Sequence, residues 1–246
     1  MSEVQVGVTT WDNKVNTFKP GQQGDVRRFK FVRLTNGNNV MRFVTPPFRY
    51  FFARVRSPQD KNKFGNRVNI SYPKYDDCPA IAAGLKAKER YYVGVLDLSD
   101  REIKILDMSV LVYEQMQEIR ADFQESKGRE VNPVEFNVNI RYNKDATSPA
   151  GYYKVLPREV EPLSEDNQAI VDEAMEDLVK NLELKSTCWR PETVTKRMAD
   201  LGWTPEFQAK IDEEERREKE AKKLAEAKDE DYDFNDPNTS ATAEAN

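Results

Sequence analysis

The chain has 246 residues, of which 33% are charged, and its mean hydropathy is −0.80. This length suits one large domain or a medium domain with appendages, and so polar a composition indicates that part of the chain is unfolded or forms a solvated helix. The sequence contains no histidine, which excludes histidine-based acid–base chemistry, histidine-dependent nucleophiles and histidine metal sites.

The charge is distributed unevenly along the chain. Residues 1–75 hold 14 Lys and Arg against 4 Asp and Glu, together with 12 of the 25 aromatic residues. The net charge is −8 over residues 76–205 and −7 over residues 206–246. Cations and rings are therefore concentrated in the first third of the sequence, and acidic residues dominate the rest.

The sequence predicts a cytoplasmic protein. No apolar run approaches the roughly 18 residues of a membrane span, and the first residues lack the pattern of a secretory signal. The two cysteines, Cys78 and Cys188, are too far apart in sequence to form a disulfide framework.

The first part of the chain reads as an N-terminal arm, residues 1–26, followed by strands. Alternating segments predict strands at 28–34, 39–45, 48–56 and 67–72. The Asn-Gly pair in the link 35–38 predicts that the first two strands form a hairpin.

Two further hairpins and several helices are expected downstream. Strands are predicted at 91–98 and 101–108, and at 134–142 and 151–157. Apolar residues at three- and four-residue spacing predict an amphipathic helix that ends near Gly128; they are Ile105, Met108, Val112, Met116, Ile119 and Phe123. Helices are also predicted after Ser164, over "RPETVTKRMADLG" and over 205–228, before an acidic, disordered tail at 229–246.

The segment "FRYFFARVR", residues 48–56, combines four aromatic residues with three arginines. In a strand, Phe51, Ala53 and Val55 would share one face and suit a core. The other face would carry Phe48, Tyr50, Phe52, Arg54 and Arg56. One interpretation is a buried aromatic strand with arginines at its rim. The other is a platform on which unpaired bases stack, at about 1–3 kcal/mol per base, while cations contact phosphates.

Similar ring–cation combinations recur in "YPKY" (72–75) and "GYYK" (151–154), and these repetitions favour the platform. The predicted nucleic-acid contacts are therefore Arg42, Phe48, Tyr50, Phe52, Arg54, Arg56, Tyr72, Lys74, Tyr75, Tyr152 and Lys154. Because a slip of one residue exchanges the two faces of a strand, the choice of face depends on the register.

The sequence predicts neither a metal site nor a cofactor nor catalysis. Cys78 lacks the further ligands of a structural zinc site and is expected to be a reduced, structural cysteine. Asp76 and Asp77 are adjacent acids of the kind common in turns, and "GQQGD" lacks the ending of a phosphate-binding loop.

Several segments resemble the single-stranded DNA-binding (helix-destabilising) proteins of T-even and related phages. The resemblance covers roughly residues 28–160 and the acidic tail. It is carried by "NVMRFVTP", "DCP", "YYVGVLDLSDREIKILDMSVLVYEQMQEI" and "NPVEFNVNIRYNKDATSPAGYYKVLP".

The resemblance implies an OB-fold-like core over 27–160, which is a five-stranded β-barrel with a basic cleft. The helical pattern that follows predicts a helical extension over 161–228. The resemblance also implies a role in phage replication, recombination and repair in the host cytoplasm, self-association on DNA, and contacts of the tail with DNA polymerase, primase, helicase loader and recombinase. The tail residues expected to bind partners are Asp229, Asp231, Tyr232, Asp233, Phe234 and Asp236. The family's zinc site is not implied here, since only Cys78 corresponds to one of its ligands.

Three other functions remain open from the sequence alone. The charged helix at 205–228 fits a scaffolding or assembly protein, and Asp76 would be a test position for a metal-dependent nuclease. Single-stranded RNA is an alternative ligand, because stacking platforms do not distinguish the two sugars.

Overall fold

A computed structural model describes residues 27–56, 58, 65–70, 78–148, 151–187 and 189–230, and for 222–223 and 225–230 only the backbone. The chain divides into two compact units, Met1–Arg54 with Arg67–Arg197, and Val55–Asn66 with Met198–Asn246.

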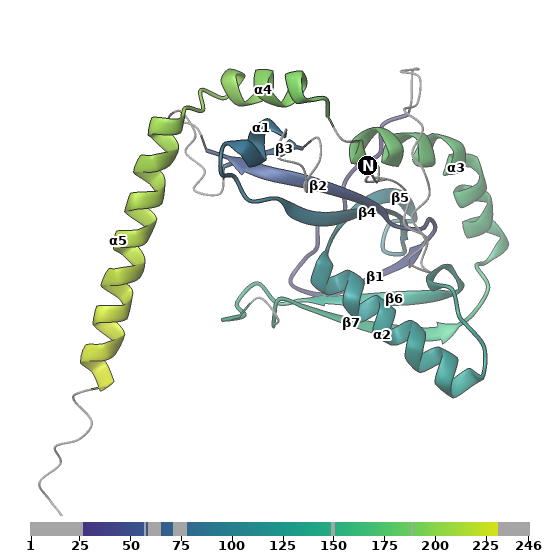
Figure 1. The fold of residues 1–246 in the computed structure, drawn as a ribbon. Helices are drawn as coiled ribbons and strands as arrows, with labels where there is room; N and C mark the ends of the chain where they lie inside the picture. Colours follow the sequence, from purple (N-terminus) through teal and green to yellow (C-terminus); the bar gives the residue numbers. More distant parts are fainter. Residues whose placement is uncertain are drawn as a thin grey trace, which may run out of the picture. The chain divides into compact units, whose positions relative to one another are not determined.

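The first unit is built mainly on an antiparallel sheet (Figure 1). Its strands are β1 (Gly37–Phe43), β2 (Phe48–Val55), β3 (Asn66–Asn69), β4 (Lys88–Asp97), β5 (Glu102–Ser109), β6 (Phe136–Tyr142) and β7 (Tyr153–Val160). The strand order is β3-β2-β4-β1-β6-β7, and β5 pairs with β4. The helical elements are α1 (Pro79–Ala82), α2 (Val110–Lys127), the short 3-10 helix η1 (Pro133–Glu135), α3 (Glu165–Ser186), α4 (Pro191–Asp200) and α5 (Pro205–Glu230).

Strand β4 is the centre of the sheet because three strands pair with it. β5 pairs with most of β4, from Arg90↔Ser109 to Asp97↔Glu102. On the other side, β2 pairs with the first half of β4 and β1 with the second half. Among the described residues no pairing joins β3 to β7, so the sheet is open and the closed five-stranded barrel expected from the sequence is not seen.

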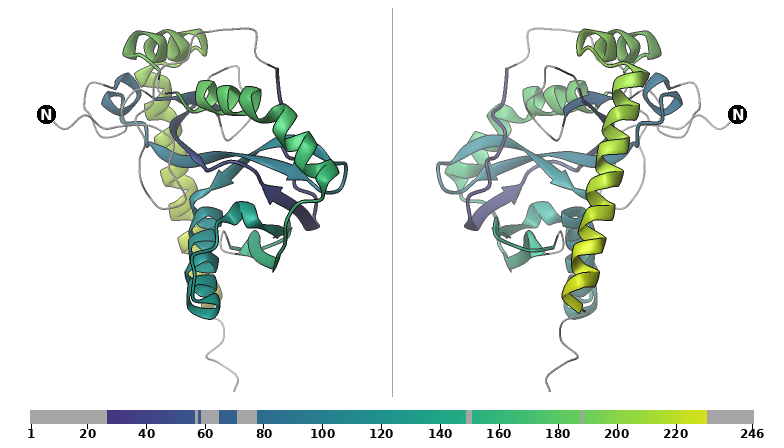
Figure 2. Two further views of the ribbon diagram at one scale, coloured as in Figure 1. Left: turned by 90° about the vertical axis from the view of Figure 1, so that its right-hand side faces the viewer. Right: turned by 90° about the vertical axis from the view of Figure 1, so that its left-hand side faces the viewer.

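The two faces of β4 carry different helices. Tyr91, Val93 and Val95 belong to a buried cluster with α2, whereas Gly94 lies against Leu178 of α3. Figure 2 shows α2 and α3 on opposite sides of β4. This alternation follows from the two-residue period of a strand, and it leaves β4 buried on both faces.

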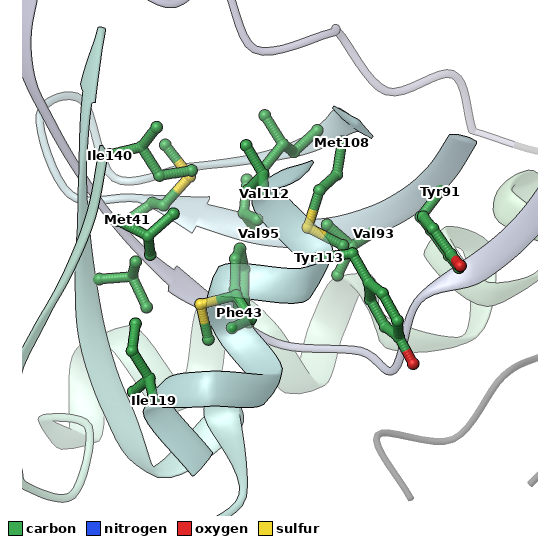
Figure 3. Packing of buried hydrophobic residues seen from close by; sticks show 14 of the residues in the cluster. Met41, Phe43, Tyr91, Val93, Val95, Met108, Val112, Tyr113, Ile119 and Ile140 are labelled. Atoms are coloured by element: carbon green, nitrogen blue, oxygen red, sulfur yellow. The ribbon is translucent and has the colours of Figure 1, made fainter. Parts of the chain in front are cut away.

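Figure 3 shows the main core, in which α2 packs against β1, β4, β5 and β6. The helix begins after Ser109, whose Oγ accepts a hydrogen bond from Val112 N, and ends at Gly128, which has a left-handed φ of 66°. The predicted stop at Gly128 is confirmed. The predicted start is too early, because Ile105 and Met108 belong to β5.

The segment 27–34 does not form the predicted hairpin with β1. It runs parallel to β5 instead, and Val32 N donates to Ile105 O at 2.9 Å while Ile105 N donates to Lys30 O at 2.9 Å. The Asn-Gly signal was outweighed by this pairing and by that of β1 with β4 and β6. The predicted pairing of 134–142 with 151–157 is confirmed as β6 and β7.

The helices of the C-terminal third match the sequence prediction. Ser164 Oγ caps α3 by accepting a hydrogen bond from Asn167 N, and Gly202 follows α4 with a φ of 70°. Helix α5 lies in the second unit, where Arg56 forms an ion pair with Glu215 at 3.1 Å. Across the described ranges, no helix combines the length and the apolar character needed to cross a membrane.

Candidate nucleic-acid interface

Four aromatic side chains form a row on the α3 side of the sheet. The ring centroids are 5.8 Å apart for Phe31 and Tyr92, 4.1 Å for Tyr92 and Tyr50, and 5.9 Å for Tyr50 and Phe52. The row forms because β2 and β4 are neighbours and place alternate residues on the same face. Phe31 is 43% exposed and Tyr92 is partly exposed, whereas Tyr50 and Phe52 are 1% and 2% exposed.

Cations lie over both ends of this row. The guanidinium carbon of Arg67 is 4.9 Å from the centroid of the Phe52 ring, and that of Arg54 is 5.9 Å from it. At the other end, Lys185 Nζ is 5.1 Å from the centroid of Phe31. We call these rings and cations, together with Arg90, the ring–cation surface.

The carboxylate of Asp107 organises the centre of the ring–cation surface. Arg90 Nε donates to Asp107 Oδ1 at 2.6 Å, Tyr50 Oη donates to the same oxygen at 2.9 Å, and Arg67 bonds the other oxygen. Asp107 is thus a single carboxylate that bonds two arginines, Arg67 and Arg90.

Two cations of the surface have a lowered pKa, whereas for Arg67 the hydrogen bond to Asp107 outweighs burial and raises the pKa. Burial lowers the pKa of Arg54, and the neighbouring Arg67 and Arg90 lower it further. Burial likewise lowers the pKa of Lys185, with Arg28 adding to the effect. A cation whose charged form is disfavoured by neighbouring cations gains stability when an anion binds beside it. The surface is therefore suited to phosphate groups.

A second group of rings lies at the end of the β6–β7 hairpin. Tyr153 stacks on Tyr142 at 5.4 Å and lies 6.4 Å from Tyr152, beside the exposed Lys154. Burial raises the pKa of Tyr153 and Arg90 opposes that rise, which places Arg90 within electrostatic reach of the hairpin. The predicted residues Tyr152 and Lys154 are the neighbours of Tyr153 in this hairpin.

Three rings predicted to stack on bases are instead buried. Phe48, Tyr50 and Phe52 are 2%, 1% and 2% exposed, so the prediction that their face is open to solvent is wrong. Phe48 packs with residues of α3, and Tyr50 and Phe52 lie beneath Tyr92 and Arg67. Ala53 and Val55 are buried as predicted, so both faces of β2 contribute to the core.

The prediction that Arg42 contacts phosphates is also wrong. This side chain is 2% exposed, and its donors are used inside the protein. Nε donates to Asn137 Oδ1 at 2.7 Å, Nη1 to Val134 O at 2.9 Å and Nη2 to Glu161 O at 2.9 Å. Arg42 therefore joins β1 to the segments that flank β6 and β7.

The remaining predicted residues are placed only in part. Arg54 lies on the ring–cation surface, whereas Arg56 belongs to the second unit. Asp229 lies in α5. Tyr72, Lys74, Tyr75, Asp231, Tyr232, Asp233, Phe234 and Asp236 fall outside the described residues.

Sequence reasoning missed Phe31, Tyr92, Arg90 and Lys185 as members of one surface. The first two lie side by side at the exposed end of the ring row, and this placement requires the pairing of β2 with β4 and of residue 31 with β5. The segment "RFKFVRL", which contains Phe31, combines cations and rings as "FRYFFARVR" does, and this pattern could have indicated that Phe31 belongs to the surface. Lys185 is 154 residues from Phe31, and no local pattern connects them.

No group of three potential metal ligands occurs among the described residues, and Cys78 is a buried free cysteine. Asp76 and Asp77 fall outside the described residues. Comparison with protein-family models and with curated protein sequences finds no match.

Proposed function

We propose that the protein is a non-enzymatic binder of single-stranded DNA and that the ring–cation surface is its nucleic-acid interface. The observation that carries this proposal is the ring row, which is partly exposed at Phe31 and Tyr92 and has cations over its two end rings, Phe31 and Phe52. A ring that is open on one side offers a π-face to an unpaired base, and the adjacent cations can contact the phosphates on either side of that base. A duplex exposes no such base faces.

The buried rings have a supporting role in this proposal. Tyr50 and Phe52 hold Tyr92 and Arg67 in place from below, and Phe31 and Tyr92 supply the stacking faces. Tyr152, Tyr153 and Lys154 at the hairpin end would continue the interface along the strand. The finer fold assignment, an OB-type sheet, belongs to the same proposal and is supported by the antiparallel pairing of β1, β2 and β5 around β4.

The biological setting is also proposed. It comprises replication, recombination and repair of phage DNA in the host cytoplasm, with the acidic tail recruiting the polymerase, primase, helicase loader or recombinase. The charge separation supports it, since the tail after residue 228 is acidic and the DNA-binding part of the chain is rich in cations.

The experiment that tests the proposal is a titration of the protein with oligo-dT, oligo-rU and a matched duplex at several salt concentrations. Binding is measured by the change in the intrinsic fluorescence of the protein. We expect oligo-dT to bind more tightly than the duplex, and log K to fall linearly with log salt by about 0.7 per phosphate contact. Equal affinity for the duplex, or a flat salt dependence, would overturn the proposal. Adding magnesium should leave the oligonucleotide intact, and cleavage would show an enzyme instead.

A further inference from the structure

A cavity of about 270 Å³ lies where the extended segment 27–30, the turn that leads into β5 and the first half of α3 meet. Figure 1 shows α3 beside β5. Part of the wall is apolar and is formed by Phe29, Ile103, Ile170 and Ala174. The other part carries four cations and two carboxylates, which are Arg27, Arg28, Lys30, Arg101, Glu102 and Glu173. Cations therefore outnumber carboxylates around this cavity.

Three of the four cations form ion pairs at the surface. The pairs are Arg27 with Glu173 at 3.5 Å, Lys30 with Glu102 at 2.9 Å and Arg101 with Asp166 at 3.4 Å. All six side chains are largely exposed. Ion pairs between exposed side chains are held weakly, because water and salt screen them. An incoming anion can therefore compete with these carboxylates for the cations of the cavity.

Arg28 is the fourth cation, and its charge is not paired in this way. Its side chain is exposed and forms neither a hydrogen bond nor an ion pair with the residues that the structure describes. Burial lowers the pKa of Lys185 on α3, and the charge of Arg28 lowers it further. The wall of the cavity therefore keeps a positive charge that the carboxylates around it leave uncompensated.

Helix α3 holds the cavity and the ring–cation surface at a fixed spacing. Asn181 Nδ2 donates to Arg27 O at 2.7 Å. One turn further along the helix, Lys185 Nζ lies 5.1 Å from the centroid of the Phe31 ring. Both ends of the segment 27–31 are thus anchored on α3, and the three residues from Arg28 to Phe31 span about 10 Å of extended chain. A strand that stacks a base on Phe31 and continues towards residue 27 passes the cavity.

The ligand that suits both places is a phosphate backbone. The fork of an arginine matches two phosphate oxygens, and a single strand carries one phosphate for each nucleotide. Such a strand can contact the cavity while one of its bases stacks on Phe31, whereas a small anion cannot reach both places. Arg54 and Arg67 lie over the other end of the ring row, so cations are available on both sides of the stacked base.

We propose that the cavity is a phosphate subsite of the nucleic-acid interface, in which Arg28 and Lys30 bind the backbone of the strand that stacks on Phe31. This inference rests on the function proposed above and extends the interface from the ring–cation surface to the first half of α3. On binding, a phosphate replaces Glu102 as the partner of Lys30 and supplies Arg28 with an anionic partner.

The first test measures the binding of fluorescently labelled oligo-dT by anisotropy at several salt concentrations. We expect Arg28→Gln to bind more weakly, with a log–log salt dependence flatter by about 0.7, the value for one phosphate contact. Glu173→Gln removes a carboxylate from the wall and releases Arg27, so it should bind more tightly, by up to about fivefold. Arg158→Gln is the matched control, because Arg158 is an exposed arginine of β7, and it should match the unmodified protein.

The second test locates the contact in the unmodified protein. Phenylglyoxal modifies accessible guanidinium groups, and mass spectrometry of the peptides gives the extent of reaction at each arginine. We expect oligo-dT to protect Arg28 and to leave Arg158 reactive. Poly-glutamate serves as a polyanion without bases, and it should protect Arg28 much less, because it has no base to stack on Phe31.

The outcomes separate this inference from the function on which it rests. If the unmodified protein binds the duplex as tightly as oligo-dT, the proposed function fails and the subsite fails with it. If oligo-dT is preferred, the subsite alone is overturned by any of three results. These are an unchanged salt dependence in Arg28→Gln, weaker binding by Glu173→Gln, and an Arg28 that stays reactive in the complex or is protected equally by poly-glutamate.

Discussion

Tyr50 and Tyr92 stack face to face, with ring centroids 4.1 Å apart and ring planes 7° apart. Tyr50 is 1% exposed and donates a hydrogen bond to Asp107, whereas Tyr92 is partly exposed. The pair therefore connects the core to the surface, and the inner ring fixes the orientation of the outer one. A stacking face held in this way loses little conformational entropy when a base binds to it.

Phe52→Ala tests the buried end of the ring row. Because Phe52 is 2% exposed, its removal leaves a cavity, and we expect the free energy of unfolding to fall by about 3–5 kcal/mol. Urea unfolding measures this loss, and binding per folded molecule should change much less than stability. A variant of normal stability that no longer binds oligo-dT would show that this ring is a contact residue.

Phe31→Ala tests the exposed end of the same row. Phe31 is 43% exposed, so we expect stability to change little and the binding of oligo-dT to weaken by about 1–3 kcal/mol, the stacking energy of one base. Fluorescence titration at fixed salt measures the change. Leu224→Ala is the control, because Leu224 is an exposed apolar side chain of α5. An equal loss in both variants would contradict a specific role for Phe31.

Arg67→Gln tests the charge of the ring–cation surface. The variant removes a cation that lies over Phe52 and releases the carboxylate of Asp107 from one of its partners. We expect weaker binding of oligo-dT and a log–log salt dependence that is flatter by about 0.7, corresponding to one lost phosphate contact. Arg216→Gln, in the charged face of α5, should keep the original slope. If the salt dependence of binding is the same in Arg67→Gln as in the unmodified protein, Arg67 does not contact a phosphate.

The sequence predicted elements with strong local signals and failed where a distant partner decided the outcome. The stop at Gly128 and the cap at Ser164 depend on residues within one helical turn, and both are confirmed. The hairpin expected around residues 35–38 did not form, because residues 27–34 pair with β5 about 70 residues later.

The candidate site shows the same limit. The composition of "FRYFFARVR" indicated a surface of rings and cations, and Arg54 does lie on it. Which face of β2 is open depends on α3, whose Leu178 and Leu182 pack with Phe48 from more than 120 residues away. No sequence pattern around Arg42 indicated that its side chain would donate hydrogen bonds to the carbonyl groups of Val134 and Glu161.

Asp97→Asn tests the turn that joins β4 to β5. Burial raises the pKa of Asp97, but hydrogen bonds from Lys104, at 2.8 Å, and from Ser99 outweigh it, and the net pKa is lowered. A lowered pKa in the folded state means that the stabilisation is complete above the unfolded pKa of about 4 and is lost as the pH falls through the folded value. Urea unfolding between pH 2 and pH 7 should show this acid-induced loss in the unmodified protein and a smaller one in Asp97→Asn. Asp166→Asn, at an exposed position, should follow the unmodified protein, and identical pH profiles for all three would contradict the assignment.

Gly94→Ala tests the contact through which α3 meets the sheet. A Cβ at this position would lie 2.5 Å from Leu178 Cδ2 and 3.0 Å from Thr45 Cγ2. Leu178 is 1% exposed and cannot move aside freely, so we expect a loss of about 1–3 kcal/mol in stability from overpacking. The displaced α3 should also move Lys185 away from Phe31 and weaken the binding of oligo-dT.

A double-mutant cycle separates this contact from a general effect of alanine at position 94. Leu178→Ala alone should destabilise the protein by about 2–5 kcal/mol, because it leaves a cavity. In the double variant the new methyl group occupies part of that cavity, so the combined loss should be smaller than the sum by about 0.5–3 kcal/mol. Urea unfolding of the four proteins measures the coupling. Additive losses would mean that Gly94 is required for a reason other than the close approach of α3, and the position of Lys185 would then not depend on it.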